Sequence, residues 1–304
     1  MKKILVIYYT QSGQLKHIID SVLSPMSNDN EYQIDFESLQ PDPEFPFPWG
    51  NHFFSFFPES VKGIPCKLKP FHFNPQTEYD LVILGYQSWY LSPSIPIWSF
   101  LQTEQAAELL KAKKVLTIIG ARNMWICSQE IIAGKLKDLK ARLVGNIVLT
   151  DHSSNYISSI TIIRWLVNGK KNATLLLPEA GVSNKDIANA SMFGNTIRDT
   201  LLNNSWDNLQ TRLINDKAVS VKYHLLKIEK NARKIFDKFA GYVLKKGQAG
   251  DPRRKKRLVV FKYYLLFMIF VVSPFASLIF RIARVILYQR TNKKILYYSG
   301  IAMK

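Results

Sequence analysis

Apolar residues recur along the first two thirds of the chain in short, continuous runs. The clearest is KILVIYY at Lys3–Tyr9; others lie at Asp80–Leu84, Lys114–Ile119 and Leu143–Thr150, with a fainter one at Tyr32–Phe36. Such runs, rich in β-branched and aromatic residues, are typical of strands covered on both faces of a parallel sheet. Helical stretches lie between or after them, at Leu15–Leu23, Ile95–Lys111, Met124–Lys140 and Lys185–Leu202. This alternation predicts an α/β fold with a doubly wound parallel sheet of five strands.

The last third of the chain has a different pattern. Leu258–Phe280 is an apolar run with one charged residue, Lys262, and it follows the basic cluster Arg253–Arg257. As a helix this run would measure about 34 Å, and a bilayer has a hydrocarbon core of about 30 Å. Soluble helices rarely run so long without a polar face. The pattern therefore predicts that residues 253–304 form a membrane anchor with a basic tail.

The arrangement of this anchor has two alternatives. The N-terminus has no recognisable signal peptide, so we expect the first domain on the cytoplasmic face of the inner membrane. A single span would export five basic residues, against the positive-inside tendency: Arg281, Arg284, Arg290, Lys293 and Lys294. Ser273-Pro274 would instead allow two half-length helices in a re-entrant hairpin. The hairpin fits the charge distribution slightly better.

The formal net charge of +18 is unevenly placed. Residues 1–200 carry a net charge of +1 and residues 201–304 a net charge of +17. Within 206–252, Lys217–Lys246 predicts a basic amphipathic helix; it suits an anionic lipid surface, or packing on the domain with a solvated basic face. Nucleic-acid binding is a weaker alternative, and we expect none. Cys66 and Cys127 are too few for a disulfide framework, and no metal motif is present.

The loops after the strands are where a doubly wound sheet binds ligands. The first consists of Thr10, Gln11, Ser12, Gly13 and Gln14 and precedes a predicted helix. Hydroxyls and backbone amides at a helix N-terminus suit a phosphate group. The loop is neither a dinucleotide fingerprint nor a Walker loop, and a plain helix cap is the alternative.

Two further strand-end loops begin with glycine and carry aromatic residues. The second offers Gly85, Gln87, Ser88, Trp89 and Tyr90, and the third offers Gly120, Arg122 and Asn123. Their aromatic side chains suit stacking against a flat ring, with packing beneath the loop as the alternative. Together, the three loops favour a cofactor site.

The segments VIYYTQSGQ, YDLVILGYQSWY and VLTIIGARN resemble flavodoxins and flavodoxin-like FMN oxidoreductases over about residues 1–205. This resemblance implies strand order 2-1-3-4-5, FMN with its phosphate on Thr10–Gln14, and a flavin ring between the second and third loops. The chain departs from that family in three places. Leu15 stands where the family usually has threonine, and inserts occupy residues 41–70 and 152–181.

The segments FPFPW, FFPES, WYLSPSIP and RNMW, together with the C-terminal apolar run, resemble flavobacterial proteins named dialkylresorcinol condensing enzymes. This resemblance implies a ketosynthase partner and the aromatising step from a 2,5-dialkylcyclohexane-1,3-dione to a dialkylresorcinol. Arg122 is then the candidate that holds the enolate of this lipophilic substrate, and Tyr86 or Tyr90 the candidate base. The alternatives are a membrane-tethered NAD(P)H:quinone or electron-transfer flavoprotein, and a flavin-less scaffold.

Overall fold

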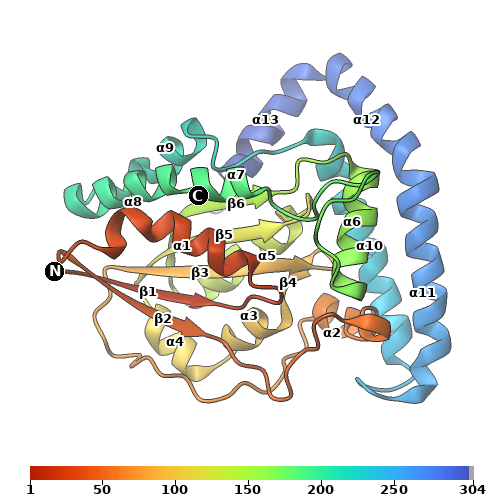
Figure 1. Ribbon diagram of the computed structural model, residues 1–304, viewed down its shortest axis with the longest axis horizontal. Helices are drawn as coiled ribbons and strands as arrows, with labels where there is room; N and C mark the ends of the chain where they lie inside the picture. Colours follow the sequence, from red (N-terminus) through yellow and green to blue (C-terminus); the bar gives the residue numbers. More distant parts are fainter. Residues whose placement is uncertain (301–304) are drawn as a thin grey trace.

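Five parallel strands form the centre of the computed structural model, which describes residues 1–300, with Asn51 described through its backbone only. They lie in the order β2-β1-β3-β5-β6 (Figure 1) and comprise β1 (Lys2–Tyr8), β2 (Tyr32–Ser38), β3 (Leu81–Trp89), β5 (Lys114–Ala121) and β6 (Arg142–Thr150). The two-residue β4 (Ser92–Pro93) pairs antiparallel with the end of β3. Without β4 the order reads 2-1-3-4-5, so the predicted flavodoxin-like fold class is confirmed.

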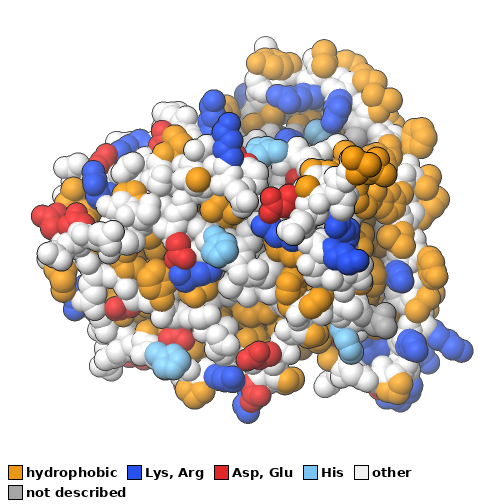
Figure 2. All heavy atoms as spheres, viewed as in Figure 1, with side chains coloured by type: hydrophobic (Ala, Val, Ile, Leu, Met, Phe, Trp, Pro, Cys, Tyr) orange, Lys and Arg blue, Asp and Glu red, His pale blue; other side chains and the backbone are white. Residues whose placement is uncertain are grey.

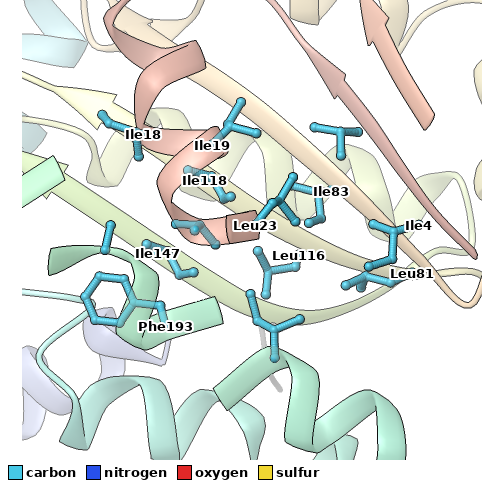
Figure 3. Close-up of a cluster of buried hydrophobic side chains, with 14 of the residues drawn as sticks. Ile4, Ile18, Ile19, Leu23, Leu81, Ile83, Leu116, Ile118, Ile147 and Phe193 are labelled. Carbon is cyan, nitrogen blue, oxygen red and sulfur yellow. The ribbon is translucent and has the colours of Figure 1, made fainter. Parts of the chain in front are cut away.

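Helices cover both faces of the sheet, because successive strand residues point to opposite sides. Ile4 and Val6 of β1 face the core beneath α1 (Gln14–Ser27), α8 (Ser191–Asn203) and α9 (Leu209–Asn215). Leu5 and Ile7 face α3 (Ile95–Phe100), α4 (Glu104–Leu110) and α5 (Ile126–Asp138). Figure 3 shows the first of these cores, with side chains of α1 lying over those of the strands.

Two stretches predicted as single helices are each divided in two. Ile95–Lys111 is interrupted after α3, because the Thr103 side chain accepts a hydrogen bond from the Ala106 amide and caps α4. Lys185–Leu202 consists of α7 (Asn184–Asn189) and α8, which meet at Ala190.

The two inserts meet at the carboxyl edge of the sheet (Figure 1). Residues 41–70 contain the short helix α2 (Phe57–Lys62), and residues 152–181 contain α6 (Asn155–Asn168). The Trp49 amide donates a hydrogen bond to the Leu166 carbonyl over 2.7 Å. The inserts thus form a joint cover over the loops that follow the strands.

The basic helix predicted at Lys217–Lys246 is α10 (Tyr223–Leu244), and it packs on the domain. Tyr223 and Leu226 join the core beside α5, and Phe236 and Ala240 pack against α2. Two alternatives were open for this helix: a lipid surface, or packing on the domain. Its apolar face packs on the domain, which leaves its basic side chains outward.

The apolar run lies within one unbroken helix, Pro252–Ile286, which is long and apolar enough to cross a membrane. It comprises a 3-10 turn at its start, α11 (Lys255–Phe267), a π-turn (Met268–Val272) and α12 (Ser273–Ile286). The predicted break into half-length helices at Ser273-Pro274 is therefore wrong. Pro274 has no N–H to offer the Phe270 carbonyl; the Tyr156 hydroxyl of α6 donates to that carbonyl instead, over 3.2 Å.

The chain reverses at Leu287 and returns to the domain through α13 (Tyr288–Ser299). Ile295 and Tyr298 pack against the core, and the Gln210 side-chain amide donates to the Ser299 carbonyl over 2.9 Å. Both ends of the apolar helix are thus fastened to the same domain.

Candidate functional site

A cavity of about 510 Å³ lies at the carboxyl ends of β3 and β5. The second and third strand-end loops form its floor through Ser88, Trp89, Tyr90, Leu91, Arg122 and Met124. Apolar side chains of α6, α10 and the helix 252–286 form its walls, among them Ile162, Leu166, Ile235, Leu265, Ile269 and Ala276. Large apolar cavities with a few convergent polar groups are typical binding sites.

Arg122 carries the only full charge among the described residues that line this cavity. Its Nη1 donates to the backbone carbonyl and Oδ1 of Asn155 and to the hydroxyls of Ser158 and Ser159, over 2.7–3.2 Å. Within residues 1–300, the hydrogen bonds of the guanidinium all leave from Nη1. Nε and Nη2 are therefore the atoms left to meet a ligand.

The charge of Arg122 persists at neutral pH despite its surroundings. Burial lowers the pKa of its guanidinium to about 10, and the carboxylate of Asp151 acts in the opposite direction. Asp151 is itself buried, and its Oδ2 has no hydrogen-bond partner among the described residues. A cation in an apolar cavity interacts strongly with an anion, because little water screens the pair.

The first strand-end loop has the features of a phosphate site. Gly13 lies in the left-handed region with φ +82, directly before α1. A Cβ there would meet no described atom within 4 Å, so the space above it is open. Thr10 Oγ1 is buried and has no hydrogen-bond partner in the part of the chain that the structure describes. The residues present therefore fit the phosphate end of FMN.

The other side chains of this loop bind protein groups. The Gln11 amide donates to the carbonyls of Phe45 and Pro46 in the first insert, over 3.3 and 2.9 Å. Gln14 exchanges two hydrogen bonds with the backbone of Val182, over 2.9 and 3.0 Å. Both glutamines thus hold neighbouring segments over the loop.

An aromatic cluster of Tyr9, Phe45, Trp49 and Trp89 lies between the first loop and the cavity. The ring of Trp89 lies 5.8 Å from Tyr9, 5.3 Å from Phe45 and 4.8 Å from Trp49, each edge to face. None of Thr10–Gln14 is among the described residues that line the cavity. Within the described residues, the first loop is thus separate from the cavity, and this cluster adjoins both: Tyr9 directly precedes the loop, and Trp49 and Trp89 line the cavity.

The two tyrosines considered as bases have hydroxyls bonded elsewhere. The Tyr86 hydroxyl is buried and donates to Gln129 Oε1 over 2.6 Å, and burial raises its pKa. Tyr90 lines the cavity, but its hydroxyl donates to the Phe53 carbonyl and burial raises its pKa too. Both hydroxyls are thus engaged by protein acceptors.

Several other predicted binding residues contact or hydrogen-bond with protein groups. A Cβ at Gly85 would lie 2.6 Å from Ile19, and one at Gly120 would lie 3.3 Å from Ile18, so these glycines let α1 approach the sheet. The Ser88 hydroxyl pairs with that of Ser128 over 2.6 Å, while Gln87 Oε1 is buried without a partner among the described residues. Asn123 donates to Asn155 Oδ1 over 2.9 Å.

Asn155 is among the residues of this site that the sequence pattern does not single out, together with Ser158 and Ser159. It lies at the start of α6 and accepts hydrogen bonds from both Arg122 and Asn123. The signal available for it is weak: Ser154-Asn155 follows the last strand at the carboxyl edge, and Ser154 caps α6.

Comparisons with known proteins find similar solved structures. No protein-family model matches the chain, and no curated protein matches it. A flavoprotein from Lactobacillus acidophilus NCFM, solved in complex with FMN, is 15% identical; the match covers 49% of this chain and 93% of that one, with a TM-score of 0.37. Flavodoxin 1 from Bacillus cereus is 15% identical, with 64% and 95% covered and a TM-score of 0.34.

A flavone reductase is 11% identical; the match covers 66% of this chain and 62% of that one, with a TM-score of 0.36. At these TM-scores the similarities add no argument about function. The strand order defines a chain with the flavodoxin-like fold.

Proposed function

We propose that this chain is an FMN-dependent oxidoreductase that aromatises a 2,5-dialkylcyclohexane-1,3-dione to a dialkylresorcinol at the cytoplasmic surface of a membrane. The observation that carries the proposal is the single cation, Arg122, on the floor of a large apolar cavity. Such a site suits a ligand with one acidic head and long apolar tails.

The reaction needs an anion-binding group and an acceptor for two electrons. A cyclic 1,3-dione is acidic and loses one proton to solvent, which gives an enolate. The enolate then gives up a hydride, and the neutral ring tautomerises to the resorcinol. Nε and Nη2 of Arg122 would hold the enolate oxygens and keep this electron-rich form populated.

FMN, when bound, would supply the two-electron acceptor. Thr10 and the backbone amides of Gln11–Gln14 at the start of α1 would hold its phosphate. Trp89 would flank the flavin ring, since it lies at the end of β3 and lines the cavity. The remaining cavity walls are apolar and suit the alkyl tails.

A lipophilic substrate explains why this site lies against the apolar helix. Each CH₂ group favours the membrane by about 0.8 kcal/mol, so a dione with two alkyl tails is found in lipid rather than in water. A ketosynthase that joins two acyl chains is the class of partner that would supply it.

Anaerobic mixing of the full-length protein, loaded with FMN, with one equivalent of a dione tests the proposal. We expect loss of the oxidised flavin absorption and one resorcinol per FMN by mass spectrometry. Arg122→Met should abolish this reaction, whereas Arg142→Met, which removes an exposed arginine paired with Asp207, should retain it. Absorption that persists would contradict the proposal; bleaching by NAD(P)H with reoxidation by a quinone, and none by the dione, would favour the quinone reductase.

The aromatic cluster favours a second candidate, a flavin-less protein that binds a lipophilic anion. Tyr9, Phe45, Trp49 and Trp89 occupy the gap between the first loop and the cavity, while the Arg122 site needs no cofactor to bind an anion. Binding of a fatty acid in the cavity, without uptake of FMN, would support this second candidate.

A further inference from the structure

The helix Pro252–Ile286 presents two different apolar faces. Leu265, Ile269, Val272, Ala276 and Phe280 recur at intervals of three or four residues and line the cavity. The opposite face is exposed along its whole length, with Tyr263, Phe267, Val271, Phe275, Leu278 and Ile282 each at least 45% exposed. One helix diameter, about 10 Å, thus separates the cavity from the outside.

The exposed face continues onto α6. The ring of Tyr156 lies 6.1 Å from that of Phe270, and Tyr156, Ile157 and Ile160 are exposed. Figure 2 shows hydrophobic side chains gathered along α11 and α12, with Lys and Arg side chains at both ends of this surface. An exposed apolar patch of this length, rimmed by charge, marks an interaction site.

Both ends of the helix are fixed to the same side of the molecule. At its start, Arg254 and Glu59 form a buried bidentate ion pair over 2.7 and 3.0 Å and are 1% and 7% exposed. Phe261 stacks on Phe57 with ring centroids 3.5 Å apart. Beyond its far end, α13 returns to the core. A helix held at both ends in this way cannot carry its far end across a bilayer without breaking these contacts.

The charge around this surface points to one occupant. Residues 252–300 contain no Asp or Glu, while they contain basic side chains at both ends of the exposed face, such as Lys255, Lys256, Arg281 and Arg284. A second copy of the chain would bring like charges together. Anionic lipid headgroups would instead neutralise these side chains while the acyl region covers the apolar face.

We propose that the outer face of Pro252–Ile286 lies in the plane of an anionic bilayer, without crossing it, and that the cavity beneath takes its lipophilic ligand directly from that leaflet. The membrane contact rests on the exposed apolar face, the fixed ends of the helix and the basic side chains around that face. The route of the ligand rests on the proposed function, because that function names the ligand.

Binding to extruded vesicles tests the contact. The full-length protein should sediment with vesicles of phosphatidylglycerol and phosphatidylcholine at least tenfold more strongly than with phosphatidylcholine alone. Phe275→Asp/Ile279→Asp changes two side chains of this helix that are 67% and 61% exposed, and it should weaken this binding at least tenfold. The matched control is Met192→Asp/Leu202→Asp, which changes two similarly exposed side chains on α8 and should leave binding unchanged. Equal binding of both variants, or a dimer that only the first variant disrupts, would overturn the proposal.

Labelling tests whether the helix crosses. Lys256→Cys and Lys294→Cys are placed singly in a Cys66→Ser/Cys127→Ala background, in sealed inside-out membrane vesicles from cells that express the full chain. An impermeant maleimide should label both cysteines to the same extent. A cysteine at position 294 that reacts only after detergent is added would show a span and overturn the in-plane arrangement.

Turnover separates this inference from the proposed function. Phe275→Asp/Ile279→Asp should convert a dione presented in vesicles at least tenfold more slowly than the unmodified protein, and a dione presented in micelles at the same rate. Equal rates in vesicles would overturn the ligand route. Absence of turnover in both preparations, including the unmodified protein, would count against the proposed function, and the sedimentation and labelling results would still decide the membrane contact.

Discussion

Asn155 donates a hydrogen bond from Nδ2 to Ser273 Oγ over 3.1 Å, and this contact joins the floor of the cavity to its apolar wall. The Oδ1 atom of the same side chain accepts hydrogen bonds from Arg122 and Asn123, each over 2.9 Å. Asn155 therefore orients the buried cation and fixes the wall helix together. This hydrogen bond explains why a serine, Ser273, lies buried within an otherwise apolar helix.

Arg122→Met should lower the affinity of the cavity for a lipophilic anion. The fluorescence of cis-parinaric acid, a long-chain carboxylic acid, reports this binding. Hydrogen bonds to charged groups contribute about 1.5–3 kcal/mol, so we expect a loss of about 10- to 100-fold. Arg142→Met is the control and should bind the probe normally. Equal affinities of the two variants would show that Arg122 does not contact the anion.

Asn155→Ala and Ser273→Ala should be coupled in stability. Each change removes one side of the same hydrogen bond, and a double-mutant cycle in urea should give a coupling free energy of about 0.5–1.5 kcal/mol. Asn155→Ala should also weaken cis-parinaric acid binding, because it releases Arg122. Ser277→Ala on the same helix serves as the control for serine loss, and zero coupling between Asn155 and Ser273 would refute the contact.

Arg254→Met should destabilise the docking of α11 on α2. Removal of one partner from a buried ion pair leaves the other charge unpaired, and this typically costs about 3–5 kcal/mol. Arg254→Met/Glu59→Leu removes both charges and should recover most of that loss in urea unfolding. Arg253→Met, which removes an exposed arginine, should change stability little. A double variant no more stable than Arg254→Met alone would contradict the pairing.

Glu229 should make stability fall as pH rises from about 4.5 to 7. This carboxyl lies 1% exposed on α10 and accepts a hydrogen bond from the Cys127 amide over 2.7 Å. Burial raises its pKa to about 7, although the backbone hydrogen bonds act against this. The unfolded chain therefore ionises first as pH rises, and folding loses on the order of 3 kcal/mol over this interval.

Glu229→Gln should remove that fall. The difference in free energy of unfolding, variant minus unmodified protein, should therefore be more positive at pH 8 than at pH 4. Urea unfolding at a series of pH values measures the difference. Glu130→Gln, which removes a partly exposed carboxylate paired with Lys230, serves as the control. Parallel profiles of unfolding free energy against pH for the unmodified protein and Glu229→Gln would show that Glu229 does not cause the fall.

Most of the sheet could be predicted from the sequence because β1, β3, β5 and β6 are largely apolar runs that their own residues specify. The signal for β2 is fainter, because this edge strand alternates apolar and polar residues. The third loop could be found in the same way, since Arg122 directly follows a strand that ends in Gly120-Ala121. Its ligand-binding role stays a prediction. Gly85 and Gly120 follow the same local pattern, yet they serve the packing of α1. Local pattern alone does not separate a glycine needed for a ligand from one needed for a helix.

The cavity could not be predicted in this way, because its walls come from segments far apart in the chain. Pro274 shows the reason most clearly. Its local signal predicts a break, but the Phe270 carbonyl, to which Pro274 cannot donate, accepts a hydrogen bond from Tyr156, a residue 114 positions earlier. Asn155 likewise has no local pattern that identifies it, since its role depends on Arg122 and Ser273.

The visible absorption spectrum of the full-length protein, purified in mild detergent, is the most direct test of FMN binding. Chromatography identifies any flavin that is released, and a second sample is measured after incubation with added FMN. We expect a flavin spectrum and about one FMN per chain, with reduced occupancy in Thr10→Val. A colourless protein that also fails to take up FMN would rule out the FMN-dependent oxidoreductase and leave the flavin-less binding protein.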